Sequence, residues 1–225
     1  MYAKFWKRLF DFLLSLSAIL VLSPLLVSLT IVGAVMMKGN PIFTQLRPGK
    51  DEKIFRLIKF RTMTNEKGPD GNFLPDEQRI IPYGKFLRST SLDELPELFN
   101  ILIGQMSIVG PRPQLVRDMV FMSADVRRRH NVRPGLTGLA QCNGRNAMSW
   151  EKKFEYDLMY IEKITFIGDA SIIIKTIAKV LKRDGITEDG AATATDLGDH
   201  LLAKGDISKE TYESLQNEAK ELLNV

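Results

Sequence analysis

The chain has 225 residues, of which 44% are hydrophobic, and a formal net charge of +4 at pH 7. This length allows one sizeable core with an appendage and excludes two large domains. The single cysteine excludes disulfides within the chain, and no Cys/His cluster has the spacing of a structural zinc site. We therefore expect the main body on the reducing, cytoplasmic side.

Charge is distributed unevenly along the chain. Residues 184–225 contain ten acidic and three basic residues, which leaves 28 basic and 17 acidic residues in 1–183. A body with this excess of positive charge suits a polyanionic partner, such as nucleic acid, an anionic membrane or a phosphorylated substrate.

A long apolar segment lies near the beginning of the sequence. The 26 residues from Phe12 to Met37 include no charged residue. As an ideal helix they would extend about 39 Å, more than the ~30 Å hydrocarbon core of a bilayer. The run is too long for the apolar part of a cleaved signal peptide, and no clear small-residue cleavage site follows it. The sequence therefore predicts a membrane segment.

Ser23-Pro24 stands near the midpoint of this segment, where proline removes a backbone hydrogen bond and kinks a helix. A spanning helix should carry positive charge mainly on its cytoplasmic side. Here the charge is similar on both flanks, with Lys4, Lys7 and Arg8 before the segment and Lys38, Arg47 and Lys50 after it. Two arrangements fit: a re-entrant helix that breaks at Ser23-Pro24 and returns, and a kinked single-pass helix.

A β-hairpin is predicted next, with strands in PIFTQ (41–45) and KIFRLIKFRTM (53–63) around the turn LRPGKDE. Alternation places Lys59 and Arg61 on the face of Phe55 and Leu57, with the two cations about 6.6 Å apart. An anion between them would relieve their repulsion; otherwise both side chains lie in solvent at the strand end.

Residues 64–83 are rich in turn-forming residues and predict a long loop, followed by a short basic helix at 84–89. The stretch STSLDELPELFN (89–100) then carries the apolar stripe of a buried helix. Ser91 and Glu94 fit a capping box, which explains Glu94 as an ordinary carboxylate of a first helical turn. Asp93 is not required by that interpretation and is a candidate for chemistry.

Arg112 lies between two prolines, which hold the backbone on both sides and suit a guanidinium presented to phosphate. A helix is predicted from 113 to 130. Its run of arginines, 127–129, would be either a solvated face or a contact with anionic lipid headgroups. Arg133 and Arg145 fall in or beside loops.

The remaining sequence predicts helices. The segments 150–164 and 169–185 are amphipathic, and the second either lies on a membrane surface or packs against the core. The acidic tail predicts a helical hairpin joined at Gly205, with no pattern that suggests chemistry. The expected fold class is α+β, with a membrane helix-break-helix, a small β-hairpin, several amphipathic helices and a C-terminal helical hairpin.

The chain resembles the bacterial sugar transferases, the monotopic phosphoglycosyl transferases that begin glycoconjugate assembly. The resemblance covers residues 1–190. It rests on four motifs behind the membrane segment: KFRTM (59–63), RSTSLDELPELFN (88–100), GQMSIVGPRP (104–113) and RPGLTGLAQCNGRN (133–146). The stretch NGRNAMSWEKKFEYD (143–157) is most similar to small members that use UDP-diacetylbacillosamine in bacterial protein N-glycosylation.

This resemblance implies a re-entrant helix at 1–38, a catalytic domain at 39–190 on the cytoplasmic face of the inner membrane, and an acidic extension at 191–225. It implies transfer of sugar-1-phosphate from a UDP-sugar to undecaprenyl phosphate, with release of UMP. The expected donor is UDP-N,N'-diacetylbacillosamine or a related N-acetylated sugar. The alternative is a galactose, glucose or N-acetylgalactosamine donor, for O-antigen, capsule or exopolysaccharide.

By resemblance, Asp93 is the nucleophile that forms an aspartyl phosphosugar, and Glu94 binds the cofactor Mg²⁺. The predicted substrate-binding cations are Lys59, Arg61, Arg88, Arg112 and Arg145. A helix amino terminus at the dyad would keep Asp93 ionised. Many relatives have an acidic residue where this chain has Gln105, so position 105 receives no metal role.

The expected partners are the UDP-sugar, undecaprenyl phosphate and the lipid bilayer, with a second copy or downstream glycosyltransferases as further candidates. Nucleic acid is not expected, because the chain has a membrane segment and no nucleic-acid motif. A competing hypothesis is a non-catalytic membrane scaffold in which Asp93 and Glu94 only cap a helix. A scaffold would not need cations from four segments around a carboxylate pair.

Overall fold

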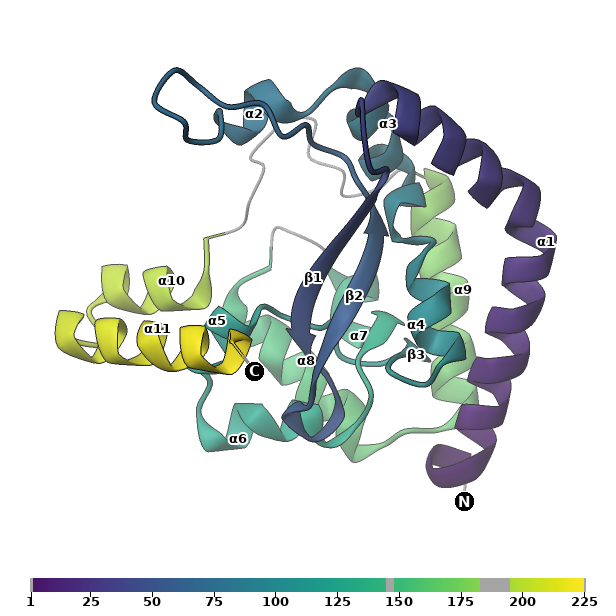
Figure 1. Ribbon diagram of the computed structural model, residues 1–225. Helices are drawn as coiled ribbons and strands as arrows, with labels where there is room; N and C mark the ends of the chain where they lie inside the picture. The colour runs from purple at the N-terminus through teal and green to yellow at the C-terminus, as the bar shows by residue number, and fades with distance from the viewer. Residues whose placement is uncertain (1, 145–147, 183–194, 225) are drawn as a thin grey trace.

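A computed structural model describes residues 2–144, 148–182 and 195–224, and it confirms the α+β fold class (Figure 1). The helices are α1 (Lys7–Met36), α2 (Asp76–Arg79), α3 (Pro82–Thr90), α4 (Glu97–Leu102), α5 (Val116–Met119), α6 (Ala124–Arg127), α7 (Leu139–Asn143), α8 (Trp150–Glu162), α9 (Phe166–Lys182), α10 (Leu197–Lys204) and α11 (Lys209–Leu223). One π-helical turn, η1 (Tyr2–Trp6), and three 3-10 turns, η2 (Lys50–Glu52), η3 (Leu92–Glu94) and η4 (Arg128–Asn131), complete them.

Two small sheets lie among these helices. Strands β1 (Ile42–Pro48) and β2 (Ile54–Phe60) form the predicted antiparallel hairpin, and Phe55 and Leu57 are buried on one face, as the alternation predicts. The second sheet is a parallel pair, β3 (Ser107–Val109) and β4 (Gly135–Thr137). The sequence did not reveal this pair, because three-residue strands are too short to show alternation.

Helix α1 continues through Pro24 and bends near its middle instead of breaking (Figure 1). Proline cannot donate to the carbonyl of Leu20, and the hydroxyl of Ser23 donates to that oxygen at 2.8 Å. The freed acceptor is therefore satisfied within the helix, so the predicted helix-break-helix is one helix with a bend. Within the described residues, Tyr2–Met36 is the one helix long and apolar enough to cross a membrane, with a mean hydropathy of 2.5.

The helix α1 packs along the body over its whole length, which is about 45 Å for 30 residues. Its middle contacts α4, and Leu26 and Leu29 join the core formed by Phe60 and Leu87. The opposite side is largely apolar and exposed; it includes Leu13, Leu20, Val21 and Val35. One side of α1 is thus part of the protein core, and the other side exposes apolar residues and serines but no charged residue between Phe12 and Met36.

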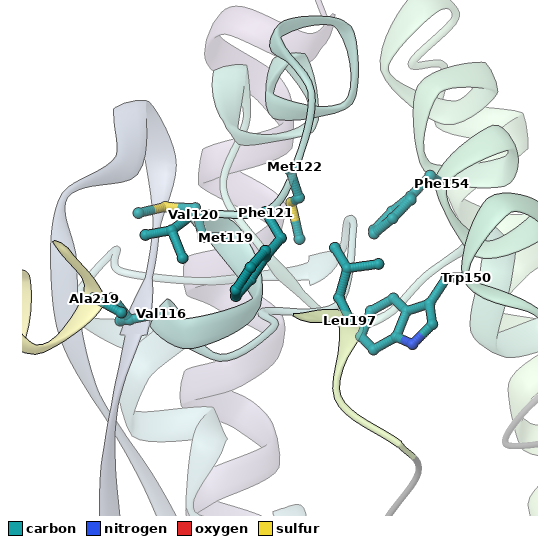
Figure 2. Packing of buried hydrophobic residues seen from close by; sticks show 9 residues of the cluster. All are labelled: Val116, Met119, Val120, Phe121, Met122, Trp150, Phe154, Leu197 and Ala219. Carbon is teal, nitrogen blue, oxygen red and sulfur yellow. The ribbon is translucent and has the colours of Figure 1, made fainter. Parts of the chain in front are cut away.

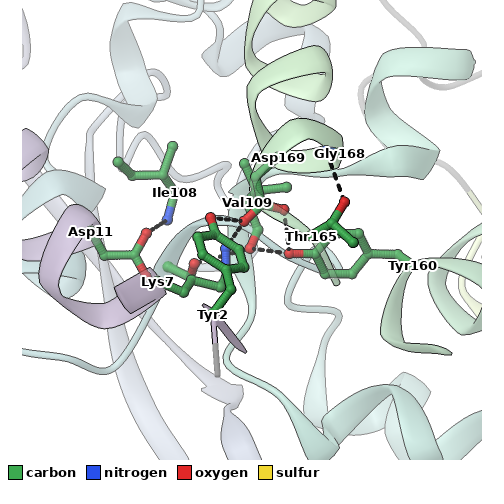
Figure 3. Close-up of polar contacts among 10 residues, drawn as sticks. Tyr2, Lys7, Asp11, Ile108, Val109, Tyr160, Thr165, Gly168 and Asp169 are labelled. Carbon is green, nitrogen blue, oxygen red and sulfur yellow. Dashed lines mark hydrogen bonds and ion pairs between the residues drawn. The ribbon is translucent and has the colours of Figure 1, made fainter. Parts of the chain in front are cut away.

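Polar contacts attach the first turns of α1 to the body (Figure 3). Lys7 Nζ donates to Asp169 Oδ2 at 2.6 Å, and the other oxygen of Asp169 accepts from the hydroxyl of Tyr160 at 3.0 Å. Asp11 Oδ1 accepts from the main-chain N–H of Ile108 at 2.9 Å. Arg8 donates to two carbonyls at the end of α4. Two of the flanking cations are therefore used in internal contacts, so the flank charges are weaker evidence for topology than the sequence suggested.

The prediction of one helix from 113 to 130 is wrong. Three short helical turns, α5, α6 and η4, occupy this region instead. The arginine run is not one uniform solvated face: Arg128 is 48% exposed and pairs with Asp125, but its two neighbours have other partners. Arg129 is buried in an ion pair with Asp157, while Arg127 makes a two-point contact with Glu52, at 2.7 and 2.6 Å. Both contacts depend on residues far away in the sequence, which a helical pattern does not reveal.

The acidic C-terminal hairpin, α10 and α11, forms as predicted, with Gly205 between the helices at φ 80°. It is packed into the body and shares its largest apolar cluster. Figure 2 shows Leu197 of α10 beside Phe121 and Trp150, and Ala219 of α11 beside Val116. The hairpin therefore completes the core behind α5.

Candidate active site

The carboxylate pair lies in η3, the single turn between α3 and α4, and not in the first turn of a long helix. Ser91 ends α3 in the left-handed region, with φ 57°, and its side chain caps neither helix. The predicted capping box between Ser91 and Glu94 is therefore wrong. The N–H of Glu94 donates to the main-chain carbonyl of Ser91 at 3.3 Å instead, and the carboxylate of Glu94 binds cations from other segments.

The carboxylate of Glu94 binds two cations from distant segments. Its Oε1 accepts from Lys59 Nζ of β2 at 2.8 Å and from Arg112 Nη2 of the loop after β3. Lys59 also contacts Glu97 Oε1 of α4 at 3.1 Å. The side chain of Arg112 is 42% exposed, so its guanidinium has a free surface for a ligand even while it holds Glu94.

Asp93 has a different environment from its neighbour. Within the described part of the chain, no side chain or backbone group donates a hydrogen bond to its carboxylate. Burial, together with the charge of Glu94, raises the pKa of Asp93 to about 6, although Lys59, Arg112 and Arg88 act in the opposite direction. This corrects the expectation that a helix amino terminus would favour ionised Asp93. The carboxylate is still largely ionised at pH 7 and is free to react.

The pKa values of Glu94 and Glu97 are shifted in opposite directions from the usual value of a glutamate. Burial opposes ionisation of Glu94, but Arg112 and Lys59 outweigh it and hold the pKa of Glu94 well below its usual range. Burial raises the pKa of Glu97 to about 7. Glu97 was missed in the sequence, although its spacing of three from Glu94 places both on one side of a helical turn. Divergent pKa values among neighbouring carboxylates are typical of functional sites.

Asn100 connects α4 to β2 and so sets the position of the carboxylates relative to Lys59. Its side-chain oxygen accepts from the N–H of Ile58 at 3.1 Å, and its amide donates to the carbonyl of Arg56 at 2.8 Å. The same amide donates to Gln105 Oε1 at 2.7 Å. Gln105 therefore supports the junction between helix and strand, a role that its neutral amide fulfils.

Arg88 reaches the site from α3. Its Nε donates to Thr62 Oγ1 at 3.0 Å, and its charge lowers the pKa of Asp93. Helix α3 can approach this closely because position 84 is glycine: a Cβ at Gly84 would lie 1.9 Å from the carbonyl oxygen of Thr62. Any other residue there would force α3 away from the strand end.

The predicted site residues are only partly brought together. Lys59 and Arg112 contact Glu94 directly, and Lys59, Arg112 and Arg88 act on Asp93 through their charges. Arg61 follows the end of β2, where no described residue forms an ion pair with its side chain. Arg145 lies outside the described residues.

The site suits a magnesium ion that is shared with a phosphorylated ligand. Mg²⁺ is usually held by one or two carboxylates together with water and substrate phosphates, and not by an all-protein cage. The described residues contain no cluster of three or more ligating side chains. Glu94 Oε2 accepts no hydrogen bond from them, so Glu94 would hold the ion together with phosphates of the ligand.

The arrangement of these residues is chemically suited to a diphosphate. A nucleophilic carboxylate can approach a phosphorus atom only where cations cancel the repulsion between anions, and three segments supply Lys59, Arg88 and Arg112 here. The unpartnered Asp93 is the group available for attack, while Glu94 is occupied by two cations.

Comparisons with known proteins agree with this chemistry. The family model described as bacterial sugar transferase matches residues 2–183. The chain is 44% identical over 204 residues to EpsL of Bacillus subtilis, an uncharacterized sugar transferase, covering 90% of this chain and 98% of that protein. It is 41% identical over 184 residues to a UDP-glucose:undecaprenyl-phosphate glucose-1-phosphate transferase of Klebsiella pneumoniae, covering 77% of this chain and 40% of the relative. It is 35% identical over 201 residues to an undecaprenyl-phosphate galactose phosphotransferase of Salmonella typhimurium, covering 81% of this chain and 42% of the relative. The chain thus spans about two fifths of the length of the last two relatives.

Proposed function

Since this chain belongs to the bacterial sugar transferase family, we propose that it transfers a sugar-1-phosphate from a UDP-sugar to undecaprenyl phosphate and releases UMP. The observation that carries the proposal is the unpartnered Asp93 beside Glu94 and the cations Lys59 and Arg112. Relatives named for glucose and galactose make these hexoses the first donors to test, with diacetylbacillosamine as the next.

The proposed reaction has two steps. In the first, a carboxylate oxygen of Asp93 forms a bond to the sugar-bearing phosphorus, and the bond from that phosphorus to the bridging oxygen breaks, so UMP leaves with its electron pair. In the second, an oxygen of undecaprenyl phosphate attacks the same phosphorus and releases Asp93 as a carboxylate. The product is a sugar linked to the lipid through a diphosphate.

The chain's own residues perform distinct parts of these steps. Arg112 and Lys59 hold Glu94 ionised and compensate the negative charge that gathers on the phosphoryl oxygens. Arg88 and Lys59 favour the ionised, nucleophilic form of Asp93. Magnesium held by Glu94 would neutralise further charge on the diphosphate and on the departing UMP.

An apolar groove beside the site supports a lipid acceptor. It has a volume of 310 Å³ and lies between the C-terminal half of α1, the hairpin and the start of α4, with Ile58, Phe60 and Pro96 among its walls. Pro96 follows Glu94 by two residues, and Ile58 and Phe60 flank Lys59 on the opposite face of β2. An amphiphile could therefore place its phosphate at the cations and its first isoprenoid units in the groove.

The membrane arrangement is also part of this proposal. Since α1 packs along the body at both ends and in the middle, it would leave the body only at the loss of that core. We propose a monotopic protein of the inner membrane, with the exposed side of α1 in one leaflet and the body on the cytoplasmic side. Exposed Phe99, Ile103, Phe166 and Ile167 on α4 and α9 would extend this lipid-facing surface.

The test of the proposed function is release of UMP from a panel of UDP-sugars, measured with and without undecaprenyl phosphate. We expect a single burst of UMP without lipid, with a labelled phosphosugar on the protein, and multiple turnovers once the lipid is added. Turnover that needs the lipid from the start, with no labelled protein, would contradict the covalent intermediate.

The groove is tested through the second step alone. Ile31→Trp, which fills the groove, should slow the transfer of a preformed adduct to undecaprenyl phosphate about tenfold or more, and should leave the UMP burst unchanged. Val21→Trp, on an exposed side of α1 outside the groove, is the matched control. Equal transfer rates in both variants would remove the groove from the proposal.

The topology is tested by tags at residue 1 and after residue 40. Both tags should be accessible from the cytoplasmic side of the membrane. A tag at residue 1 that is reached only from the periplasm would mean that α1 crosses the membrane.

A further inference from the structure

The loop that presents Arg112 is held by its main-chain carbonyls. Pro111 and Pro113 restrict the backbone on both sides of Arg112, as the sequence predicts. In addition, Pro111 O accepts from the N–H of Gly135 at 2.9 Å, and Pro113 O accepts from Arg47 Nη1 at 3.1 Å. The base of the Arg112 side chain is therefore held by contacts that no local pattern in GPRP indicates.

The carbonyl of Arg112 itself is held by a buried ion pair. Arg129 Nη2 donates to Arg112 O at 2.6 Å, and Nε and Nη2 of Arg129 donate to Asp157 Oδ2 at 2.9 and 2.7 Å. The side chains of Arg129 and Asp157 are 1% and 3% exposed. The planar guanidinium thus connects α8, which carries Asp157, to the backbone of the site loop.

Stability alone does not explain why these two charges are buried. Removing two ions from water costs several kcal/mol, and well-packed apolar residues of similar volume are often as stabilising as a buried ion pair. An apolar pair, however, could not donate to the carbonyl of Arg112. A rigid, forked donor fits that requirement, and lysine would not reproduce its geometry.

We propose that Arg129 and Asp157 are positioning residues for the reaction, which act by holding the Arg112 backbone so that its guanidinium reaches Glu94. This inference rests on the proposed function for its effect on rate. It concerns residues that contact neither the dyad nor a phosphate and that lie on η4 and α8, behind the site.

Misplacing Arg112 has a consequence that loss of folded protein does not have. A guanidinium that moves away from Glu94 no longer faces the phosphoryl oxygens in the first step. Each folded molecule then forms the adduct more slowly, so the rate constant of the UMP burst falls. A variant with fewer folded molecules would instead give a smaller burst with an unchanged rate constant.

The experiment compares three variants of the full chain in detergent or nanodiscs. Arg129→Lys keeps a charge but lacks the fork. The double variant Arg129→Met/Asp157→Leu replaces the buried pair with apolar side chains of similar size, so that the fold survives without the contact to Arg112. Arg127→Gln is the control, since it removes a neighbouring arginine that pairs with Glu52 and does not contact Arg112.

We expect the rate constant of the UMP burst to be about 10- to 100-fold lower in the double variant, with an amplitude that matches its folded fraction. Arg127→Gln should match the wild type in both. A double variant with the wild-type rate constant, or with only a smaller amplitude, would overturn the proposal.

A second measurement tests the placement of Arg112 without activity. The guanidinium of Arg112, followed by NMR with labelled arginine, should lose its contact with Glu94 in the double variant and keep it in Arg127→Gln. An unchanged guanidinium signal in the double variant would overturn the positioning role. A wild type that releases no UMP would refute the proposed function alone, since this measurement still tests the placement of Arg112.

Discussion

Two charged clusters meet at Arg112, and they differ in how completely their charges are paired. In the back pair, Arg129 and Asp157, one cation matches one anion, and both are almost fully buried. The front cluster consists of Lys59, Asp93, Glu94, Glu97 and Arg112; there, three carboxylates share two cations, and Asp93 has no partner.

This difference separates a structural from a reactive arrangement of charge. In the back pair, burial raises the pKa of Asp157 while Arg129 lowers it, and one cation serves one carboxylate. In the front cluster, burial together with the charge of Glu94 raises the pKa values of Asp93 and Glu97 to about 6 and 7, while Arg112 and Lys59 hold the pKa of Glu94 down. Replacing Asp93 in the front cluster should therefore abolish the reaction without lowering the stability of the fold. Replacing Asp157 in the back pair should lower that stability.

The largest expected effect is that of Asp93→Asn. The amide keeps the shape of the side chain but cannot form the acyl phosphate, so we expect turnover and labelled adduct to fall by at least about 10⁴-fold. Its stability should equal or exceed that of the wild type, because a buried carboxylate with a raised pKa has been removed. Adduct assays and thermal melts check both parts, with Asp125→Asn on the surface as the control. A fully active variant would contradict the mechanism.

Asp157→Asn, in the back pair, should have its main effect on the stability of the fold. Breaking one side of a buried ion pair leaves Arg129 charged and unpaired, which costs about 3–5 kcal/mol of unfolding free energy. Denaturant unfolding in detergent measures this loss. Glu52→Gln breaks the partly exposed pair with Arg127 and should cost no more than about 1 kcal/mol. Equal losses in the two variants would mean that burial does not distinguish these pairs.

The pH dependence of the wild type should reflect the front cluster. Because the pKa of Asp93 is about 6, the nucleophilic carboxylate is lost as the pH falls through that value. The rate of the UMP burst should then fall about tenfold for each further pH unit. Rapid-mixing assays between pH 5 and 8 test this. A burst rate that is constant over that range would show that ionisation of Asp93 does not limit the first step.

The last prediction concerns stability alone, in Glu97→Gln. Burial raises the pKa of Glu97 to about 7 in the folded protein, above the 4.5 of an exposed glutamate, so folding favours the neutral form. Its contribution to stability is therefore complete below pH 4.5 and is lost as the pH rises through 7. At pH 8 the variant should be more stable than the wild type by up to about 3 kcal/mol, with no difference near pH 4. A less stable variant at pH 8 would mean that the contact between Glu97 and Lys59 outweighs burial.

The sequence predicted those features that depend on neighbours along the chain. The apolar run of α1, the hairpin with Phe55 and Leu57 on one face, and the helices of the acidic tail were all recognisable from local patterns. The interpretation of Ser91 and Glu94 as a capping box was wrong for the same reason. The motif shows only that the two residues have the spacing of a capping box. In the structure Ser91 adopts a left-handed conformation, and the carboxylate of Glu94 binds Lys59 and Arg112.

The sequence by itself therefore determined the membrane-type helix, the strand that carries Lys59, and the residues available for chemistry, because hydrophobic periodicity and residue type are properties of short segments. Tertiary structure alone decided which carboxylate stays unpartnered, that Glu97 joins the site, and that Arg129 supports Arg112 from behind. These outcomes depend on ion pairs between residues far apart in the chain and on burial. Burial sets the cost of each charge only after α3, α4, β2 and the loop of Arg112 have come together.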